Sequence, residues 1–116
     1  MSTKSPESWA SDPQTKGLRI EVSPERSLLL PHGQFIFAGL TSGGDEQNLK
    51  LVFATHEISV RGHHLRRIGT TMQRLELSLL AKLPSSQRSL ITEGQPVILE
   101  ILVTEMKSTQ GENARN

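Results

Sequence analysis

Six basic side chains in one short stretch are the residues best suited to bind a ligand: Arg61, His63, His64, Arg66, Arg67 and Arg74. Residues 56–74 contain a single acid, Glu57, so their net charge is +3, whereas the whole chain carries +1. A guanidinium group pairs with phosphate or carboxylate oxygens through two parallel hydrogen bonds, and imidazole becomes charged at lower pH. The stretch therefore predicts an anion-binding surface for nucleic acid or a phosphorylated ligand.

Two features of the composition weigh against nucleic acid as the favoured partner. The sequence pI is about 8.2, which is far from the strongly basic balance of a chromatin protein. The chain has three Phe, one Trp and no Tyr, which leaves few aromatic rings for stacking on bases. A solvated basic face is the simpler interpretation of these arginines, and binding to a polyanion is the alternative.

Three histidines within nine residues suggest a second kind of chemistry, metal binding. His56, His63 and His64 carry imidazole, the commonest metal ligand in proteins. Consecutive residues of a strand point to opposite faces, so at most one of His63 and His64 joins His56. The chain has no cysteine to complete a site. We expect exposed histidines with neither metal nor cofactor, and a metal site is the other interpretation.

The chain lacks the residue patterns of common enzyme sites. Its only aspartates are Asp12 and Asp45, and a Ser-His-Asp triad would have to use Asp45 or a glutamate. The glycine-rich segment 39–47 is not followed by a Lys-Ser or Lys-Thr pair, and it leads into a strand pattern rather than a helix. We therefore predict no enzymatic activity and interpret this segment as a hairpin loop.

Length and composition predict one folded domain between two polar arms. The chain has 116 residues, the size of an ordinary domain. Residues 1–16 and 106–116 hold few apolar side chains and are expected to be disordered, which leaves residues 17–105 as the globular part. Trp9, alone in the first arm, is an anchor for a partner, a weak latch onto its own domain or part of a disordered tail. Without a secretory signal pattern or a membrane-spanning apolar run, a cytoplasmic protein with no membrane contact is expected.

Alternation of apolar and polar residues predicts that most of the folded part is β-strand. Strands are expected at 18–22, 27–30, 34–40 and 97–103, and as a hairpin over 49–61, with a loop at 41–48. The segments 34–40 and 97–103 carry apolar residues on both sides, a pattern typical of strands in the middle of a sheet.

Residues 70–83 fit two patterns. Leu75, Leu77 and Leu79 alternate as in a strand, whereas apolar positions between Met72 and Leu83 also recur at helical spacing. A capping-box pattern at the start, good helix formers inside the segment and a proline directly after it favour a helix over 71–83. A strand is the alternative.

Together these patterns predict an α+β fold: a β-rich single domain with a mostly antiparallel sheet of about five to six strands and one covering helix. Exposed sheet edges and leucine-rich elements in a small domain are typical of an interaction or assembly module. We expect a non-enzymatic protein that binds another protein chain or further copies of itself. Binding of a polyanion or nucleic acid through residues 61–74 is the alternative function.

Overall fold

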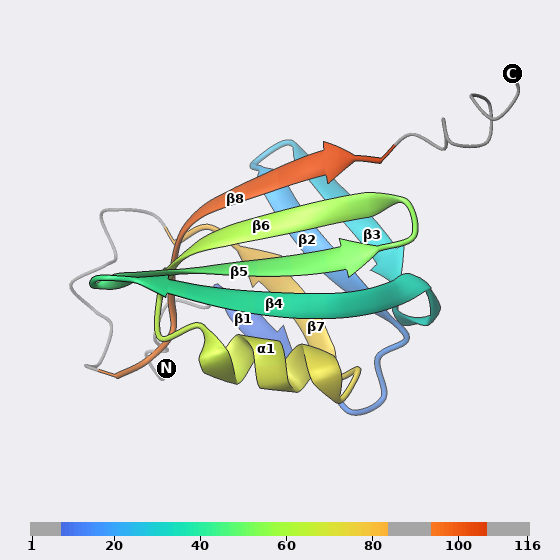
Figure 1. Cartoon of the computed structure of the whole chain (residues 1–116). Helices are drawn as coiled ribbons and strands as arrows, with labels where there is room; N and C mark the ends of the chain where they lie inside the picture. The colour runs from blue at the N-terminus through green and yellow to red at the C-terminus, as the bar shows by residue number, and fades with distance from the viewer. Residues whose placement is uncertain (1–7, 84–93, 107–116) are drawn as a thin grey trace, which may run out of the picture.

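Eight strands form two four-stranded sheets in the computed structural model, which describes residues 8–83 and 94–106 (Figure 1). The first sheet has the order β1-β7-β2-β3 and contains β1 (Trp9–Ser11), β2 (Gly17–Ser23), β3 (Arg26–Pro31) and β7 (Leu77–Ala81). The second sheet has the order β4-β5-β6-β8 and contains β4 (Phe35–Gly43), β5 (Glu46–Phe53), β6 (His56–His63) and β8 (Val97–Glu105). The helix α1 (Arg66–Gln73) connects β6 to β7, and a short 3-10 helix, η1 (His32–Gln34), connects β3 to β4.

The strand pairs are antiparallel in both sheets except for β2 and β7, which run parallel. Parallel neighbours require a crossover connection. Here the chain between them passes through β3, the three consecutive strands β4 to β6, and α1 before it returns to the first sheet. Three strands of the second sheet and the helix therefore lie between β2 and β7 in the chain, and β8 completes the second sheet after β7.

The core lies between the two sheets, and α1 closes the side of the molecule next to β4 and β7 (Figure 1). Alternate residues of the strands point inward, as the period of two requires. Leu18 and Ile20 of β2 are fully buried in one cluster with Leu49, Leu51 and Phe53 of β5. The helix contributes its own buried side to the same cluster with Ile68 and Met72, preceded by Leu65. The ring of Phe53 also packs edge-on against Phe35, with 5.4 Å between the ring centres.

The predicted fold class is confirmed: the protein is a β-rich α+β domain with mostly antiparallel sheets and one helix among its described residues. The number of strands is larger than the expected five to six, and they form two sheets rather than one. The two additional strands are β1, inside the expected N-terminal arm, and β7, inside the expected helix. The loop predicted at 41–48 is also shorter than expected. Strands β4 and β5 continue through most of it, and only Gly44 and Asp45 form the turn, with Gly44 at a φ of 68°.

The position of the predicted helix is wrong. The helix spans Arg66–Gln73, and the second half of the expected segment is strand β7. Leu75 marks the change, because its φ of 58° lies in the left-handed region and ends the helical path. Leu77 then inserts into the core as a fully buried residue, while Leu75 stays 43% exposed. The pairing of β7 with both β1 and β2 outweighs the helical propensity of the segment.

The two strands expected in the middle of a sheet are edge strands. β4 and β8 are the first and last strands of the second sheet. Their inward residues pack on the core, so the apolar residues on their other side remain in contact with solvent. Ile36 and Phe37 of β4 are 59% and 54% exposed, and Leu102 of β8 is 60% exposed. The two-sided apolar pattern is thus correct as a sequence observation, but its interpretation as burial is wrong.

The folded part begins earlier than the predicted boundary at Gly17. Ser8 is buried, and β1 pairs Trp9 with Leu80 of β7. The side chain of Trp9 packs against the core cluster, so the latch is the arrangement that the structure contains. Strand β1 thus lies within the segment 1–16 that was expected to be an arm, and its backbone pairing with β7 adds to the packing of the Trp9 ring. Of the expected arms, residues 1–7 and 107–116 lie outside the described residues.

Candidate functional site

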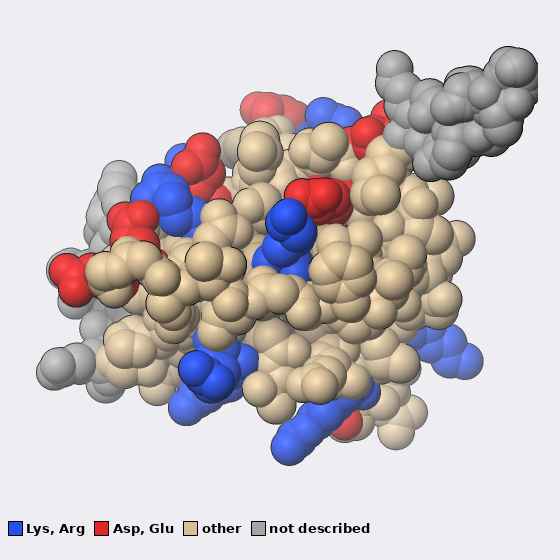
Figure 2. Space-filling view, in the orientation of Figure 1, with Lys and Arg blue, Asp and Glu red and all other residues tan. Residues whose placement is uncertain are grey.

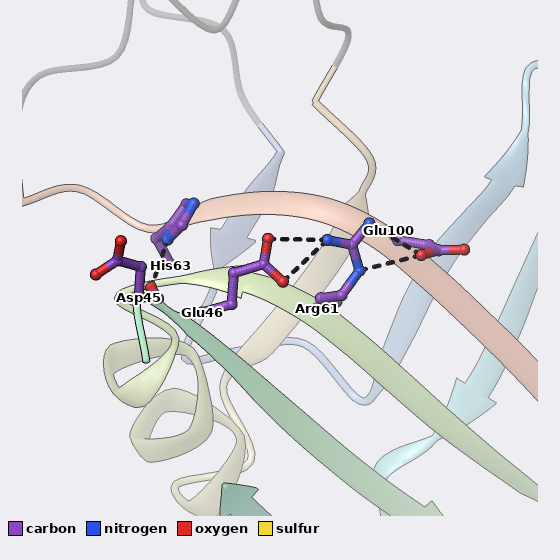
Figure 3. Close-up of polar contacts among 5 residues, drawn as sticks. All are labelled: Asp45, Glu46, Arg61, His63 and Glu100. Carbon is purple, nitrogen blue, oxygen red and sulfur yellow. Dashed lines mark hydrogen bonds and ion pairs between the residues drawn. The ribbon is translucent and has the colours of Figure 1, made fainter. Parts of the chain in front are cut away.

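Arg61 is held in an ion-pair network on the outer face of the second sheet (Figure 3). Its Nη1 donates to both carboxylate oxygens of Glu46, at 3.1 Å each. Its Nε and Nη2 donate to Oε1 of Glu100, also at 3.1 Å each. The hydrogen bonds to Glu46, followed by those to Glu100, raise the pKa of Arg61 above its ordinary value. Two carboxylates surround one guanidinium, so this part of the predicted anion-binding stretch presents no free positive charge.

The register of the sheet brings these three residues together. Arg61 of β6 lies directly opposite Glu100 of β8. On its other side β6 pairs with β5, the strand that begins at Glu46. Residues that face each other on neighbouring strands have side chains close enough to interact. The network therefore links three strands across the outer surface and is a structural feature of the sheet.

The three histidines do not form one cluster, because His56 lies far from His63 and His64. His63 ends β6, and its Nδ1 donates to the backbone carbonyl of Asp45 at 2.8 Å (Figure 3). His64 follows in the left-handed region with a φ of 56° and is exposed. His56 is at the opposite end of β6, about 23 Å from His63 at the usual rise of a strand. Within residues 8–83 and 94–106, no group of three or more His, Asp or Glu side chains is placed to hold a metal ion.

The remaining three arginines belong to α1 or its end, and they occupy two faces. Successive residues of a helix are turned by about 100°, so Arg67 and Arg74, seven residues apart, share one face. Arg66 is turned by roughly a quarter of a circle from them. In the part of the chain that the structure describes, none of the three forms an ion pair. In Figure 2, blue side chains lie over α1, whereas those on the visible face of the second sheet have red neighbours.

A groove of about 440 Å³ runs between β4 and α1. Residues 35–40 of β4 line one wall, and Leu49 of β5 lies between the two walls. The helix lines the other wall with residues of a single face: Arg66, Gly69, Thr70 and Gln73. Gly69 allows α1 to lie close to Leu49, because a Cβ there would come within 3.3 Å of Cδ1 of Leu49. Arg66 is the one charged residue among the groove lining that the structure describes.

The edge of β4 opens into this groove. β4 pairs only with β5, so one side of its backbone lacks a neighbouring strand. The register shifts between Phe35 and Phe37, which marks a bulge at Ile36. Figure 1 shows α1 running along β4 below its open edge, in the opposite direction to the strand. The groove therefore combines an unpaired strand edge, an apolar wall formed by β4 and one cation on the helix wall.

Sequence reasoning reached one residue of this groove, Arg66, and missed the others. The signal for the β4 wall is present in the sequence as an apolar pattern on both sides of residues 34–40. The helix wall could not be found in the same way, because Gly69, Thr70 and Gln73 are not apolar and the helix was expected at 71–83. These three residues lie on one face of α1 only because the helix spans Arg66–Gln73.

Comparison with known proteins adds no relative to this description: no family model matches the chain, and no significant match occurs among curated proteins or solved structures. In the described residues, no helix is both long enough and apolar enough to cross a membrane.

Proposed function

We propose that this protein is a non-enzymatic interaction module that binds an extended segment of another protein chain along β4. The observation that carries the proposal is the open edge of β4, which exposes Ile36 and Phe37 and adjoins the groove with α1. An incoming strand would hydrogen-bond to the unpaired backbone of β4, and its alternate side chains would enter the groove. Backbone pairing supplies affinity in this mode, and the pockets for side chains supply specificity.

The other edge of the second sheet, strand β8, presents less exposed apolar surface to a partner. Among the described residues, β8 exposes one large apolar side chain, Leu102, whereas β4 exposes two that are adjacent. The groove borders β4 and not β8. An exposed edge with neighbouring apolar side chains is a site for pairing with another strand. The β4 edge is therefore the binding element of this proposal.

A segment of a different chain suits this edge better than a second copy of the same protein. Edge-to-edge pairing of β4 with its own copy around a two-fold axis would bring the two α1 helices toward each other. Each helix carries Arg66 and Arg67 and ends at Arg74, with no acidic residue in its span Arg66–Gln73. Like charges at close range oppose such a dimer. A single extended segment meets no such repulsion.

Polyanion binding, the alternative function, has one observation in its favour. Arg67 and Arg74 share an exposed face of α1. Two exposed arginines support only weak, salt-dependent attraction to phosphates, since each neutralised phosphate adds a small electrostatic gain. An oligonucleotide is therefore included as a competitor in the test of the main proposal.

The test is a selection of random displayed peptides on the immobilised protein. Peptides of about nine residues suit the nine residues of β4. The enriched peptides are synthesised, and their affinities are measured by fluorescence anisotropy with the wild-type protein. The double variant Ile36→Ser, Phe37→Ser is expected to lower these affinities by about tenfold or more, because it removes the apolar surface beside the edge.

The matched control is Leu102→Ser, which removes an equally exposed leucine from the opposite edge of the same sheet. It is expected to change the affinities by less than about twofold. The proposal fails if no peptide is enriched, if the two edges respond equally, or if a single-stranded oligonucleotide displaces the peptides at low salt and binds more tightly than they do. Thermal melts of both variants confirm that the fold is retained.

A further inference from the structure

We infer that the groove between β4 and α1 selects segments in which an acidic side chain, Asp or Glu, pairs with Arg66 while apolar side chains of the same segment pack on β4. This inference rests on the proposed function and specifies the chemistry of its partner. It is based on the combination, in one groove beside a strand edge, of the apolar β4 wall with Arg66, a cation that forms no ion pair with any described residue.

Charge complementarity is the first step of the argument. Arg66 is exposed, lines the groove and forms no ion pair within the described residues. The described lining contains no carboxylate, so an acid in the ligand would not compete with an acid of the protein. By contrast, Arg61 is fully engaged by Glu46 and Glu100. Arg66 is therefore the arginine of the predicted stretch that a ligand carboxylate can reach in this groove.

The direction of α1 gives the groove two chemically different ends. Because α1 runs opposite to β4, its first residue, Arg66, lies toward the Leu40 end of the groove (Figure 1). Gln73, at the other end of the helix, lies toward Phe35 and the exposed Ile36. Thr70 lies between them on the same wall, where its hydroxyl can hydrogen-bond to a ligand. The acid and the apolar side chains of a ligand should thus occupy opposite ends.

The length of the helix sets the spacing within the ligand. Arg66 and Gln73 are seven residues apart, which is about 10 Å along a helix at 1.5 Å per residue. A strand covers that distance in roughly three residues, and only every second side chain points to the same face. We therefore expect the acidic residue to be two or four positions from the main apolar residue of the bound segment.

The experiment repeats the peptide selection with charge-reversed proteins. Peptides selected on the wild-type protein, displayed without a free C-terminus at the binding segment, should be enriched in Asp or Glu. Arg66→Glu should weaken their binding by about tenfold or more and should shift a new selection toward Lys or Arg. Arg67→Glu is the matched control, since it makes the same charge change on the neighbouring face of α1. It should alter affinity by less than about threefold.

The outcomes separate this inference from the proposed function. Enriched peptides that depend on Ile36 and Phe37 but show no acidic preference would overturn the inference and leave strand addition at β4 intact. Equal effects of Arg66→Glu and Arg67→Glu would also overturn it, because they would indicate general attraction to a basic helix. If no peptides are enriched at all, both the function and the inference fail. Amidated and acetylated synthetic peptides ensure that a side-chain carboxylate, not a chain end, carries the effect.

Discussion

Single residues in this protein divide into those that hold the sheets together and those that face the groove. Arg61 illustrates the first kind, because its guanidinium is committed to Glu46 and Glu100 on the outer face of three strands. Arg66, five positions later, illustrates the second, because it lines the groove without an ion pair in the described part of the chain. The sequence presents both as members of one basic stretch. Only the register of the strands and the start of α1 distinguish their roles.

Gly62 is a residue whose identity the structure requires. It lies at the register shift between β6 and β8, where a Cβ would overlap the backbone carbonyl oxygen of Val97. Gly62→Ala is therefore expected to lower the free energy of unfolding by about 1–3 kcal/mol, measured by urea denaturation. Gly43→Ala is the control, because nothing lies within 4 Å of a Cβ there. Equal effects of the two substitutions would show that close packing at Gly62 is not the cause.

At the scale of elements, the decisive feature is that strand β7 occupies part of the segment 71–83 for which a helix is predicted. β7 lies between β1 and β2, and its pairing with both buries Leu77 and Leu80. The short helix before it depends on tertiary contacts rather than on a side-chain cap. The residue before the helix, its N-cap Leu65, donates its backbone N–H to Oε1 of Gln47 at 2.7 Å.

Substitution of two nearby leucines tests this assignment. Leu77→Gln places an amide in the core and is expected to cost about 2–5 kcal/mol of unfolding free energy. Leu75→Gln, at a residue 43% exposed between α1 and β7, is expected to change stability by less than about 0.5 kcal/mol. Thermal or urea melts compare the two directly. The reverse order of the two effects would restore the helix over 71–83 in place of β7.

Alternating apolar residues were sufficient to predict β2, β5 and β6 as strands, because a half-buried strand must alternate, whereas β3 and β8 were predicted from apolar runs after turn or loop residues. The same signal could not tell edge from centre for β4 and β8. In the sequence, an apolar side chain on the outer side of a strand gives the same pattern whether the protein's own elements cover it or it is left exposed for a partner. The pattern thus predicts that Ile36 and Phe37 are covered, although they are the exposed apolar residues of the candidate site. Neighbour relations between distant strands, such as β2 beside β7, have no local signature at all.

For the whole molecule, the arrangement of α1 beside β4 predicts a monomer in the absence of a partner. Repulsion between arginine-bearing helices opposes pairing of two β4 edges. The other large apolar side chains that are exposed among the described residues lie outside β4: Leu29, Leu75, Leu102 and Met106. Size-exclusion chromatography with light scattering should give a mass near 12.8 kDa at concentrations up to about 100 μM. A dimer that the Ile36→Ser, Phe37→Ser variant dissociates would mean that a second copy occupies the β4 edge.

The most direct test of strand addition at β4 is amide hydrogen exchange, followed residue by residue by NMR, with and without a saturating selected peptide. The β4 amides that do not donate to β5 have no neighbouring strand in the free protein and should become more protected when a peptide strand pairs with them. Amides of β8, on the opposite edge, should exchange at unchanged rates. Unchanged exchange throughout β4, together with new protection at β8, at β3 or on the Arg67 face of α1, would contradict the account.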